Sequence, residues 1–228
     1  MGGLNVKNTI VEHVLRIIAP HPCYGCGKVG TILCDNCKYD IIHEPFVGCF
    51  VCGKPQNDGI CPIHDSFLEK IVIVSTRSGP LEETINTLKF SNVKGSARTL
   101  AELLDMVLPL LPASTQIVPV PTVRSHVRQR GYDQVELIAQ HLANLRGYSV
   151  VRALKRIGNA TQHTADRATR QLQSQDAFAL NENSLGEGPV LILDDIITTG
   201  STLLAAAKLL RNHASPVLAA ALAYQPLD

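Results

Sequence analysis

The stretch that decides the fold reads VLILDDIITTGST and runs from Val190 to Thr202. Four apolar residues come first, and two adjacent acids, Asp194 and Asp195, follow them directly. Five of the next seven residues are Thr, Gly or Ser, and the apolar residues after them have helical spacing. We therefore expect a buried strand, a short polar loop and a helix that begins at Ser201.

This loop has the chemistry of a sugar-phosphate site. A helix N-terminus offers unpaired backbone N–H groups and the positive end of the helix dipole, and Gly200 lets the backbone approach an anion closely. Two carboxylates would repel a phosphate, but they can accept hydrogen bonds from a vicinal diol. Ribose 5-phosphate has the shape that satisfies both halves. The hydroxyl donors around the glycine are Thr198, Thr199, Ser201 and Thr202.

Two other interpretations of the loop explain less of it. A plain strand–turn–helix with a Ser or Thr N-cap accounts for one hydroxyl, but not for four hydroxyls and a glycine after paired acids. A Walker-type nucleotide loop is excluded because no Gly-Lys-Ser/Thr sequence follows Gly200.

From about Phe67 onward, apolar strands alternate with helical patterns. This alternation predicts an α/β fold in which helices cover both faces of a parallel sheet. Ligands of such sheets bind at the carboxyl ends of the strands, where the two acids are expected. The expected strands are Lys70–Thr76, Thr115–Val120, Tyr148–Leu154, Pro189–Asp195 and Pro216–Tyr224, and the expected helices are Leu81–Lys89, Ala97–Leu111, Gln134–Arg146 and Ser201–His213.

All seven cysteines lie between positions 23 and 61, as three CxxC pairs and one Cys-x-x-His pair. Two intervening residues let both ligands of a pair hold one ion, and a glycine follows Cys26 and Cys52 as in a tight knuckle. The eight ligands suffice for two tetrahedral Zn²⁺ sites, which look structural because protein fills every position. We expect one site from Cys23, Cys26, Cys34 and Cys37, and a second from Cys49, Cys52, Cys61 and His64.

Other uses of these cysteines stay open. A cross-braced arrangement would join the first pair with the third and the second with the fourth, and either one or two ions could be bound. Disulfides fit poorly because no secretory signal is evident, and redox pairs rarely come three at a time. A segment of roughly 45 residues with so few large apolar side chains could hardly fold without metal.

Composition sets the broad class. The chain has 228 residues, 45% hydrophobic, and a net charge of +1, as is typical of a soluble globular protein. Residues 1–20 favour an amphipathic helix over a signal peptide, and no apolar run approaches the roughly 20 residues of a membrane span. We therefore expect a cytoplasmic protein with no membrane insertion. Residues Pro119–Arg170 carry nine Lys/Arg and three acids, which indicates an anionic partner or a solvated basic face.

The motif Val190–Thr202 resembles the 5-phosphoribosyl 1-pyrophosphate (PRPP) signature of type I phosphoribosyltransferases. Two further features, VPVPTVRSHVRQRGYDQVELIA (Val118–Ala139) and the multi-CxxC head, are similar to the ComF family. The resemblance covers nearly the whole chain. Departures are Tyr132 and Asp133 where Phe and Asn are usual. Two more, in Ala160–Phe178, are Gln173 where Asn is usual and Asp176 where Gly is usual.

The resemblance implies a type I phosphoribosyltransferase-like body that binds PRPP with Mg²⁺. Asp194 and Asp195 would act on the ribose hydroxyls as catalytic residues, and the loop after them would hold the 5′-phosphate. Lys89 would contact the substrate or else end a solvated helix. The segment Gly158–Gln175 would form a lid carrying Arg167 and Arg170. The residues expected to bind PRPP are Lys89, Thr122, Val123, Arg124, Arg130, Arg170, Asp194, Asp195, Ile196, Thr198, Thr199, Gly200, Ser201 and Thr202, with Arg128 and Lys155 as further cations.

Three functions remain possible at this point. The chain could be an enzyme that transfers a phosphoribosyl group to an unknown acceptor, and the ComF resemblance links it to DNA uptake and natural transformation. It could instead be a non-catalytic competence factor that binds PRPP and single-stranded DNA, or an interaction scaffold built on zinc ribbons that meets DNA-uptake proteins. The expected organisation is an N-terminal helix (residues 1–20), a double zinc ribbon (21–66) and the phosphoribosyltransferase-like domain (67–228).

Overall fold

A computed structural model of the chain describes residues 21–56, 59–64, 67–157 and 178–226. The expected N-terminal helix over residues 1–20 lies outside the described residues. In chain order the elements are α2 (Asp35–His43), β1 (Lys70–Thr76), α3 (Gly79–Phe90), α4 (Gly95–Val107), β2 (Gln116–Pro119), α5 (Arg124–Arg130), α6 (Gln134–Arg146), β3 (Ser149–Val150), β4 (Leu154–Arg156), β5 (Phe178–Leu180), a 3₁₀ turn (Glu182–Ser184), β6 (Val190–Ile197), α8 (Ser201–Leu210) and β7 (Val217–Tyr224).

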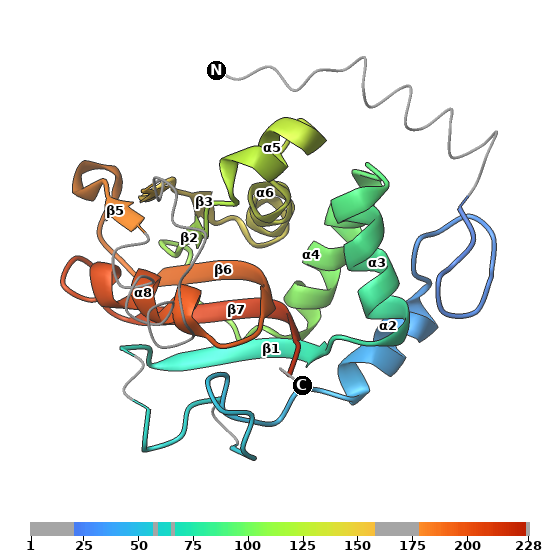
Figure 1. Cartoon of the computed structure of the whole chain (residues 1–228), viewed down its shortest axis with the longest axis horizontal. Coiled ribbons are helices and arrows are strands. Elements are labelled where there is room, and N and C mark those ends of the chain that lie inside the picture. Colours follow the sequence, from blue (N-terminus) through green and yellow to red (C-terminus); the bar gives the residue numbers. More distant parts are fainter. Residues whose placement is uncertain (1–20, 57–58, 65–66, 158–177, 227–228) are drawn as a thin grey trace, which may run out of the picture.

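The body is a parallel sheet with the strand order β1-β7-β6-β2-β3, which confirms the predicted fold class. Figure 1 shows β1, β7 and β6 side by side, with α3, α4 and α6 grouped apart from α8. The helix after β2 therefore lies on one face and the helix after β6 on the other. A crevice opens at the carboxyl ends of two neighbouring strands where the chain departs to opposite faces, and β2 and β6 are such a pair.

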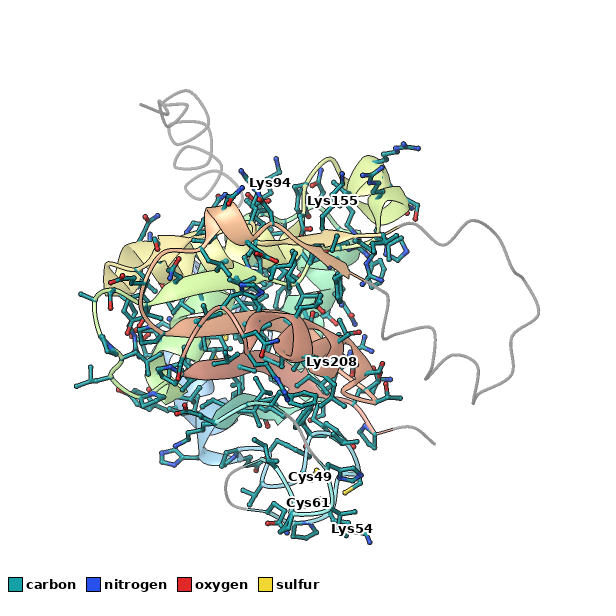
Figure 2. The ribbon with its side chains drawn as sticks, turned by 90° about the vertical axis from the view of Figure 1, so that its left-hand side faces the viewer. Cys49, Lys54, Cys61, Lys94, Lys155 and Lys208 are labelled. Carbon is teal, nitrogen blue, oxygen red and sulfur yellow. The ribbon has the colours of Figure 1, made fainter. Side chains whose placement is uncertain are left out.

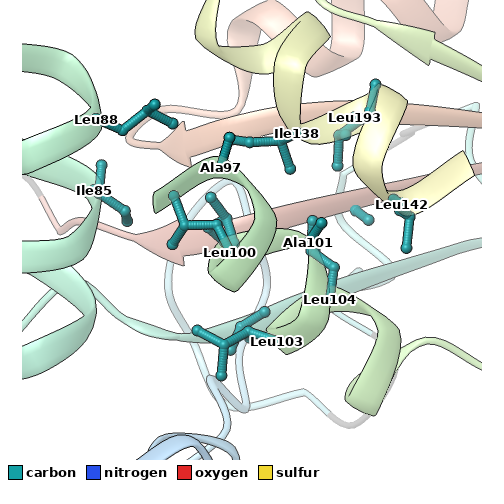
Figure 3. Close-up of a cluster of buried hydrophobic side chains, with 14 of the residues drawn as sticks. Ile85, Leu88, Ala97, Leu100, Ala101, Leu103, Leu104, Ile138, Leu142 and Leu193 are labelled. Carbon is teal, nitrogen blue, oxygen red and sulfur yellow. The ribbon is translucent and has the colours of Figure 1, made fainter. Parts of the chain in front are cut away.

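Alternating side chains of the strands supply both faces of the sheet with a core. On the first face α3, α4 and α6 bury their apolar stripes against odd-numbered residues of β6 such as Leu191 and Leu193. Figure 3 shows Leu100, Ala101 and Leu104 of α4 between α3 and α6 in this cluster. The second face packs α8 against Val190 and Ile192 of β6 and also takes in Phe50 of the cysteine-rich head.

Several sequence-based boundaries were wrong. Tyr148–Leu154 was expected as one strand, but β3 pairs with β2 over two residues only, and β4 belongs to a separate antiparallel pair with β5. The chain thus leaves the edge of the main sheet after Val150. Two expected helices end earlier, at Val107 and Leu210, and helices α2 and α5 were not anticipated.

The head packs against the body through both of its cysteine clusters. Helix α2 follows Cys34 directly, and Lys38 on it forms an ion pair with Glu102 of α4 at 2.7 Å. Within the described residues, none of the helices has the length and apolar character required to cross a lipid bilayer.

Candidate functional site

The two acids lie where β6 runs past the end of its neighbour. Strand β2 pairs with β6 only as far as Pro119, opposite Leu193, whereas β7 continues alongside to Ile197. Asp194 and Asp195 therefore lie at the open side of β6, in the crevice between the carboxyl ends of β2 and β6. Asp195 is buried with 7% of its surface exposed, and Asp194 is half-buried.

A hydrogen-bonded network holds Asp195. Its Oδ2 lies 2.9 Å from the Lys89 ammonium and accepts a hydrogen bond from Gln134 Nε2 at 3.0 Å. Gln134 in turn accepts from Arg130 Nη1 at 2.7 Å, and Asp195 Oδ1 accepts from the backbone N–H of Ile196 at 2.7 Å. Three predicted site residues, Lys89, Arg130 and Asp195, thus belong to one chain of contacts. In this conformation Lys89 contacts the acid itself.

Asp194 has a different environment. Burial and the neighbouring charge of Asp195 raise the pKa of the Asp194 carboxyl to about 8, while Lys89 and Arg156 act in the opposite direction. Its Oδ1 accepts a hydrogen bond from the Asp195 backbone N–H at 2.8 Å. Two adjacent carboxyls that cannot both ionise easily give one group that keeps its proton near neutral pH.

The glycine-containing loop leads directly into α8. Gly200 occupies the N-cap position with φ +69°, a left-handed conformation that suits glycine, and no side chain caps the helix. The interpretation as an ordinary Ser or Thr cap is therefore wrong. Thr199 is exposed, and its hydroxyl lies 2.9 Å from that of Ser201. Thr198, Ser201 and Thr202 are half-buried, so the predicted hydroxyls surround a helix N-terminus without closing it.

Gly200 has a second role that the sequence did not reveal. A Cβ atom on Gly200 would lie 2.7 Å from Cδ2 of Phe50 and 3.2 Å from its backbone oxygen. We expected the absence of a side chain at Gly200 to let an anion approach the backbone. On this side, however, Phe50 of the head fills the space. The N-terminus of α8 thus remains the part of the loop that can receive an anion.

The loop after β2 differs from the expectation. Thr122, Val123 and Arg124 were expected to offer donors to pyrophosphate, but both Thr122 donors are already engaged by Asp133, its N–H at 2.9 Å and its Oγ1 at 2.9 Å. The same carboxylate caps α6 by accepting from the N–H groups of Val135 and Glu136. Asp133, where an amide is usual, therefore organises this loop. Val123 and Arg124 are exposed at the start of α5.

Tyr132, also in this turn, packs in the interior. It is buried, and its hydroxyl donates a hydrogen bond to the backbone oxygen of Leu88 at the end of α3. This contact joins α3, and so Lys89, to the start of α6.

Sequence reasoning missed two polar residues at the crevice, Gln134 and Arg156, and a third, Arg77, which lies two strands away from β6 in the sheet order. Gln134 joins Arg130 to Asp195, as described above. Arg156 of β4 donates to the Pro121 backbone oxygen at 3.2 Å and lies over the Phe178 ring at 5.0 Å. Arg77, at the end of β1, binds Gln225 and Asn86, and its buried Nε has no hydrogen-bond partner among the described residues. For Arg77 and Arg156 the available signal was their position at the end of a strand, whereas Gln134 is the first residue of α6. Arg167 and Arg170, in the segment expected to form a lid, lie outside the described residues.

The cysteine-rich head gathers its ligands into two groups. One contains Cys23, Cys26, Cys34 and Cys37, and the other contains Cys49, Cys52, Cys61 and His64, with the donor atoms of each group within 4.8 Å of one another. The donor atoms thus group as in the tandem arrangement rather than the cross-braced one. Four soft donors at such spacing fit tetrahedral Zn²⁺, and each set leaves no position for a substrate.

A cavity of about 600 Å³ lies between the second cysteine cluster and the glycine loop. From the head it is lined by Phe46, Val51, Cys52 and Gly53, and from the body by Thr76, Thr198, Thr199, Tyr224 and Pro226. The rings of Phe46 and Tyr224 and the threonine side chains therefore line one cavity next to the expected phosphate site.

Comparison of the sequence with known proteins assigns the chain to a class. Residues 127–227 match the phosphoribosyl transferase domain family. Competence protein F of Haemophilus influenzae is 31% identical over 197 residues, which cover 79% of this chain and 84% of that protein. DNA utilization protein YhgH of Salmonella typhi is 32% identical over 213 residues, with 81% and 93% covered. Competence protein ComFC of Bacillus subtilis is 26% identical over 192 residues, with 78% and 77% covered.

The fold and the matched domain thus define a protein with a phosphoribosyltransferase-type body. The relatives align with most of both chains and carry competence names. The chain belongs to the ComF family, as the quoted motifs predicted.

Proposed function

We propose that this protein binds PRPP with Mg²⁺ in the crevice between β2 and β6, and that it transfers or senses the phosphoribosyl group. The observation that carries the proposal is the position of Asp194 and Asp195 beside the open N-terminus of α8. The carboxyls would accept hydrogen bonds from the ribose 2′- and 3′-hydroxyls, and the loop Thr198–Thr202 would bind the 5′-phosphate. Residues 21–66 would serve as a zinc-bound head and residues 67–228 as the binding body.

Charge supports this orientation of the substrate. The pyrophosphate group would lie on the β2 side, where Arg156 and Arg130 approach the crevice from β4 and α5. Guanidinium groups suit phosphate oxygens because they donate two parallel hydrogen bonds. The hydrogen bond from the Ile196 backbone N–H to Asp195 Oδ1 would help to orient this carboxylate at the end of β6. Mg²⁺ would supply charge neutralisation at the pyrophosphate, and carboxylate oxygens such as that of Asp194 are ligands it prefers.

Transfer would break the bond between ribose C1 and pyrophosphate, which leaves with the bonding electron pair, while a lone pair of the acceptor forms the new bond to C1. The half-buried Asp194, with its raised pKa, holds a proton near neutral pH, and a cation bound beside it would lower this pKa so that the proton passes to solvent. A link to DNA uptake is part of this proposal, and it is supported by the names of the competence and DNA utilization relatives.

Calorimetric titration with PRPP and MgCl₂ tests the site. Asp194→Asn and Asp195→Asn should each abolish measurable binding, and Glu187→Gln should leave it unchanged. Glu187 is a matched control because it is exposed and precedes the opposite end of the same strand. Pyrophosphate release on addition of candidate bases and amines then separates an enzyme from a sensor. Unchanged binding in both Asp variants would contradict the proposal.

A second candidate is a non-catalytic protein that binds PRPP and single-stranded DNA. It is favoured by α5, a helix with no buried residue that carries Arg124, Arg128 and Arg130. Phosphate charge would draw such a helix to a strand without any need for turnover. Binding of PRPP with no pyrophosphate release from any acceptor, together with salt-dependent DNA binding, would favour this candidate.

A further inference from the structure

The second cysteine cluster contacts the glycine loop through one side chain. Phe50 is fully buried, and its ring lies so close to Gly200 that any side chain there would collide with it. Its backbone oxygen also lies 3.2 Å from the position of a Gly200 Cβ. The loop that precedes α8 therefore rests on a residue of the head, more than a hundred positions earlier in the chain.

Phe50 is held in place by the cluster itself. It follows Cys49 and precedes Cys52 by two residues, so it forms part of the knuckle between two ligands. Its N–H donates to the Gly59 backbone oxygen at 2.9 Å, and the Gly53 N–H donates to the Cys49 oxygen at 2.7 Å. In Figure 2 Cys49 and Cys61, from the two halves of this cluster, lie close together at the same end of the molecule.

A second contact joins the same knuckle to the strand beside the loop. A Cβ on Gly53 would lie 3.0 Å from the Tyr224 hydroxyl, and the Phe46 and Tyr224 rings stack with centroids 4.1 Å apart. Next to Tyr224, the N–H of Gln225 donates to the Ile197 oxygen at 2.8 Å, directly before the loop. The head thus supports both the start and the end of the loop.

The first cluster provides a contrast within the same molecule. It packs against α3 and α4, where a Gly25 Cβ would lie 3.6 Å from Pro80 and Lys38 pairs with Glu102. Tyr24 occupies the same place after Cys23 that Phe50 occupies after Cys49, but it joins the core on the other face of the sheet.

We propose that Phe50 is a positioning residue through which the metal-bound second cluster holds the loop Thr198–Thr202 in its phosphate-binding conformation. This inference rests on the proposed function of that loop. The N-cap of α8 is a glycine with no side chain to cap the helix, and the contact from the Ser201 N–H to Thr199 Oγ1 is long, at 3.4 Å, so the loop holds its own backbone only weakly. A fixed aromatic surface behind Gly200 removes this freedom before the ligand arrives, which is how preorganisation raises affinity.

Coupling of this kind must act in both directions. If the second cluster orders the loop, a phosphate in the loop must change the environment of the metal in that cluster, and the first cluster should not respond. This gives a spectroscopic readout that a purely structural contribution of Phe50 would not produce.

The experiment uses the full chain and ribose 5-phosphate with MgCl₂ as the probe. Calorimetric titration compares the wild-type protein with Phe50→Ala, Phe50→Leu and the matched control Tyr24→Ala, after metal analysis has shown equal zinc content. Phe50→Ala should weaken binding about tenfold, the size expected when about one residue must be ordered on binding. Phe50→Leu should restore part of the loss, and Tyr24→Ala should leave the affinity unchanged.

Cadmium-113 NMR of the protein loaded with cadmium provides the second arm and needs no variant. Ribose 5-phosphate should shift the signal of the Cys₃His cluster and leave that of the Cys₄ cluster in place, and Phe50→Ala should suppress the shift. Equal affinities of wild type and Phe50→Ala, or no selective shift, would overturn this inference while the proposed function stands. Failure of ribose 5-phosphate and PRPP to bind the wild-type protein would overturn both.

Discussion

The Lys89 ammonium lies 2.9 Å from Asp195 Oδ2, and the two side chains are only 15% and 10% exposed. The pair joins the end of α3 to the end of β6, two segments more than a hundred residues apart in sequence. A diol that bound to Asp195 would therefore contact a carboxylate that is already paired with Lys89 and oriented by Gln134. Such a contact holds the acid in place without a ligand.

The energetic cost of breaking this pair can be measured. Lys89→Met should destabilise the protein by about 3 kcal/mol, because loss of one partner leaves a buried charge uncompensated. Asp195→Asn in the same chain should recover part of this loss, so a double-mutant cycle in urea should give a coupling of about 1 kcal/mol or more. Purely additive effects would show that the two groups do not interact in solution.

The raised pKa of Asp194 predicts how stability depends on pH. Its folded pKa, about 8, exceeds the ordinary value of 3.8, so the group's stabilising contribution is complete below the ordinary value and is lost as pH rises through about 8. Wild-type stability should fall between about pH 5 and pH 8, by at most about 1.4 kcal/mol for each pH unit from this group, and should level off above about pH 8. Asp194→Asn should flatten the decline in urea-unfolding midpoints. Equal slopes in both proteins would contradict the assignment.

The same group predicts a pH dependence of binding. Mg²⁺ near the carboxyl favours its ionised form, so binding of PRPP with Mg²⁺ should release a proton below pH 8. Calorimetry in buffers of different ionisation enthalpy should detect this proton, and the affinity should rise up to about pH 8 and then level off. Glu187→Gln keeps both acids and should release the same proton, so it serves as the control. Affinity that falls over this range would contradict the account.

The two donor groups of the head predict two zinc ions for each chain. Mass spectrometry of the metal content should find two equivalents in the wild type and one in Cys26→Ser or Cys52→Ser. Removal of both ions by a chelator should unfold the head, because a structural metal supplies folding free energy to so small a segment. A full zinc complement in either variant would refute the ligand assignment.

Helix α5 predicts a salt-dependent affinity for single-stranded DNA if the second candidate function holds. Arg124 and Arg128 are exposed on this helix. Replacing both with Ala should reduce the slope of log K against log salt concentration by about 1.4, since each lost phosphate contact contributes about 0.7. Arg98→Ala, an exposed arginine on α4, is the control. An affinity for DNA that does not change with salt concentration would exclude phosphate contacts by this helix.

Sequence reasoning succeeded where local pattern decides the outcome. The run Val190–Leu193, the acids and the small residues lie next to one another in the chain, so strand, loop and helix followed from hydrophobic periodicity. The metal clusters were predicted for the same reason, because ligand spacing within each pair is a local property.

Contacts between distant segments could not be predicted. Lys89 was expected near the substrate, but its pairing with Asp195 depends on how α3 packs beside β6. The two hydrogen bonds from Thr122 to Asp133 likewise depend on the shape of a turn, which no local sequence pattern predicts. The prediction of one strand over Tyr148–Leu154 was wrong because this segment is divided between two sheets. Its first part forms β3 at the edge of the main sheet, and its last residue begins β4 in the separate antiparallel pair.

The most direct test is a crystal structure of the protein with ribose 5-phosphate and Mg²⁺. The account predicts the phosphate at the N-terminus of α8, against the backbone of Thr199–Thr202, with the 2′- and 3′-hydroxyls on Asp194 and Asp195. A phosphate bound instead along α5, with the hydroxyls away from both acids, would contradict it.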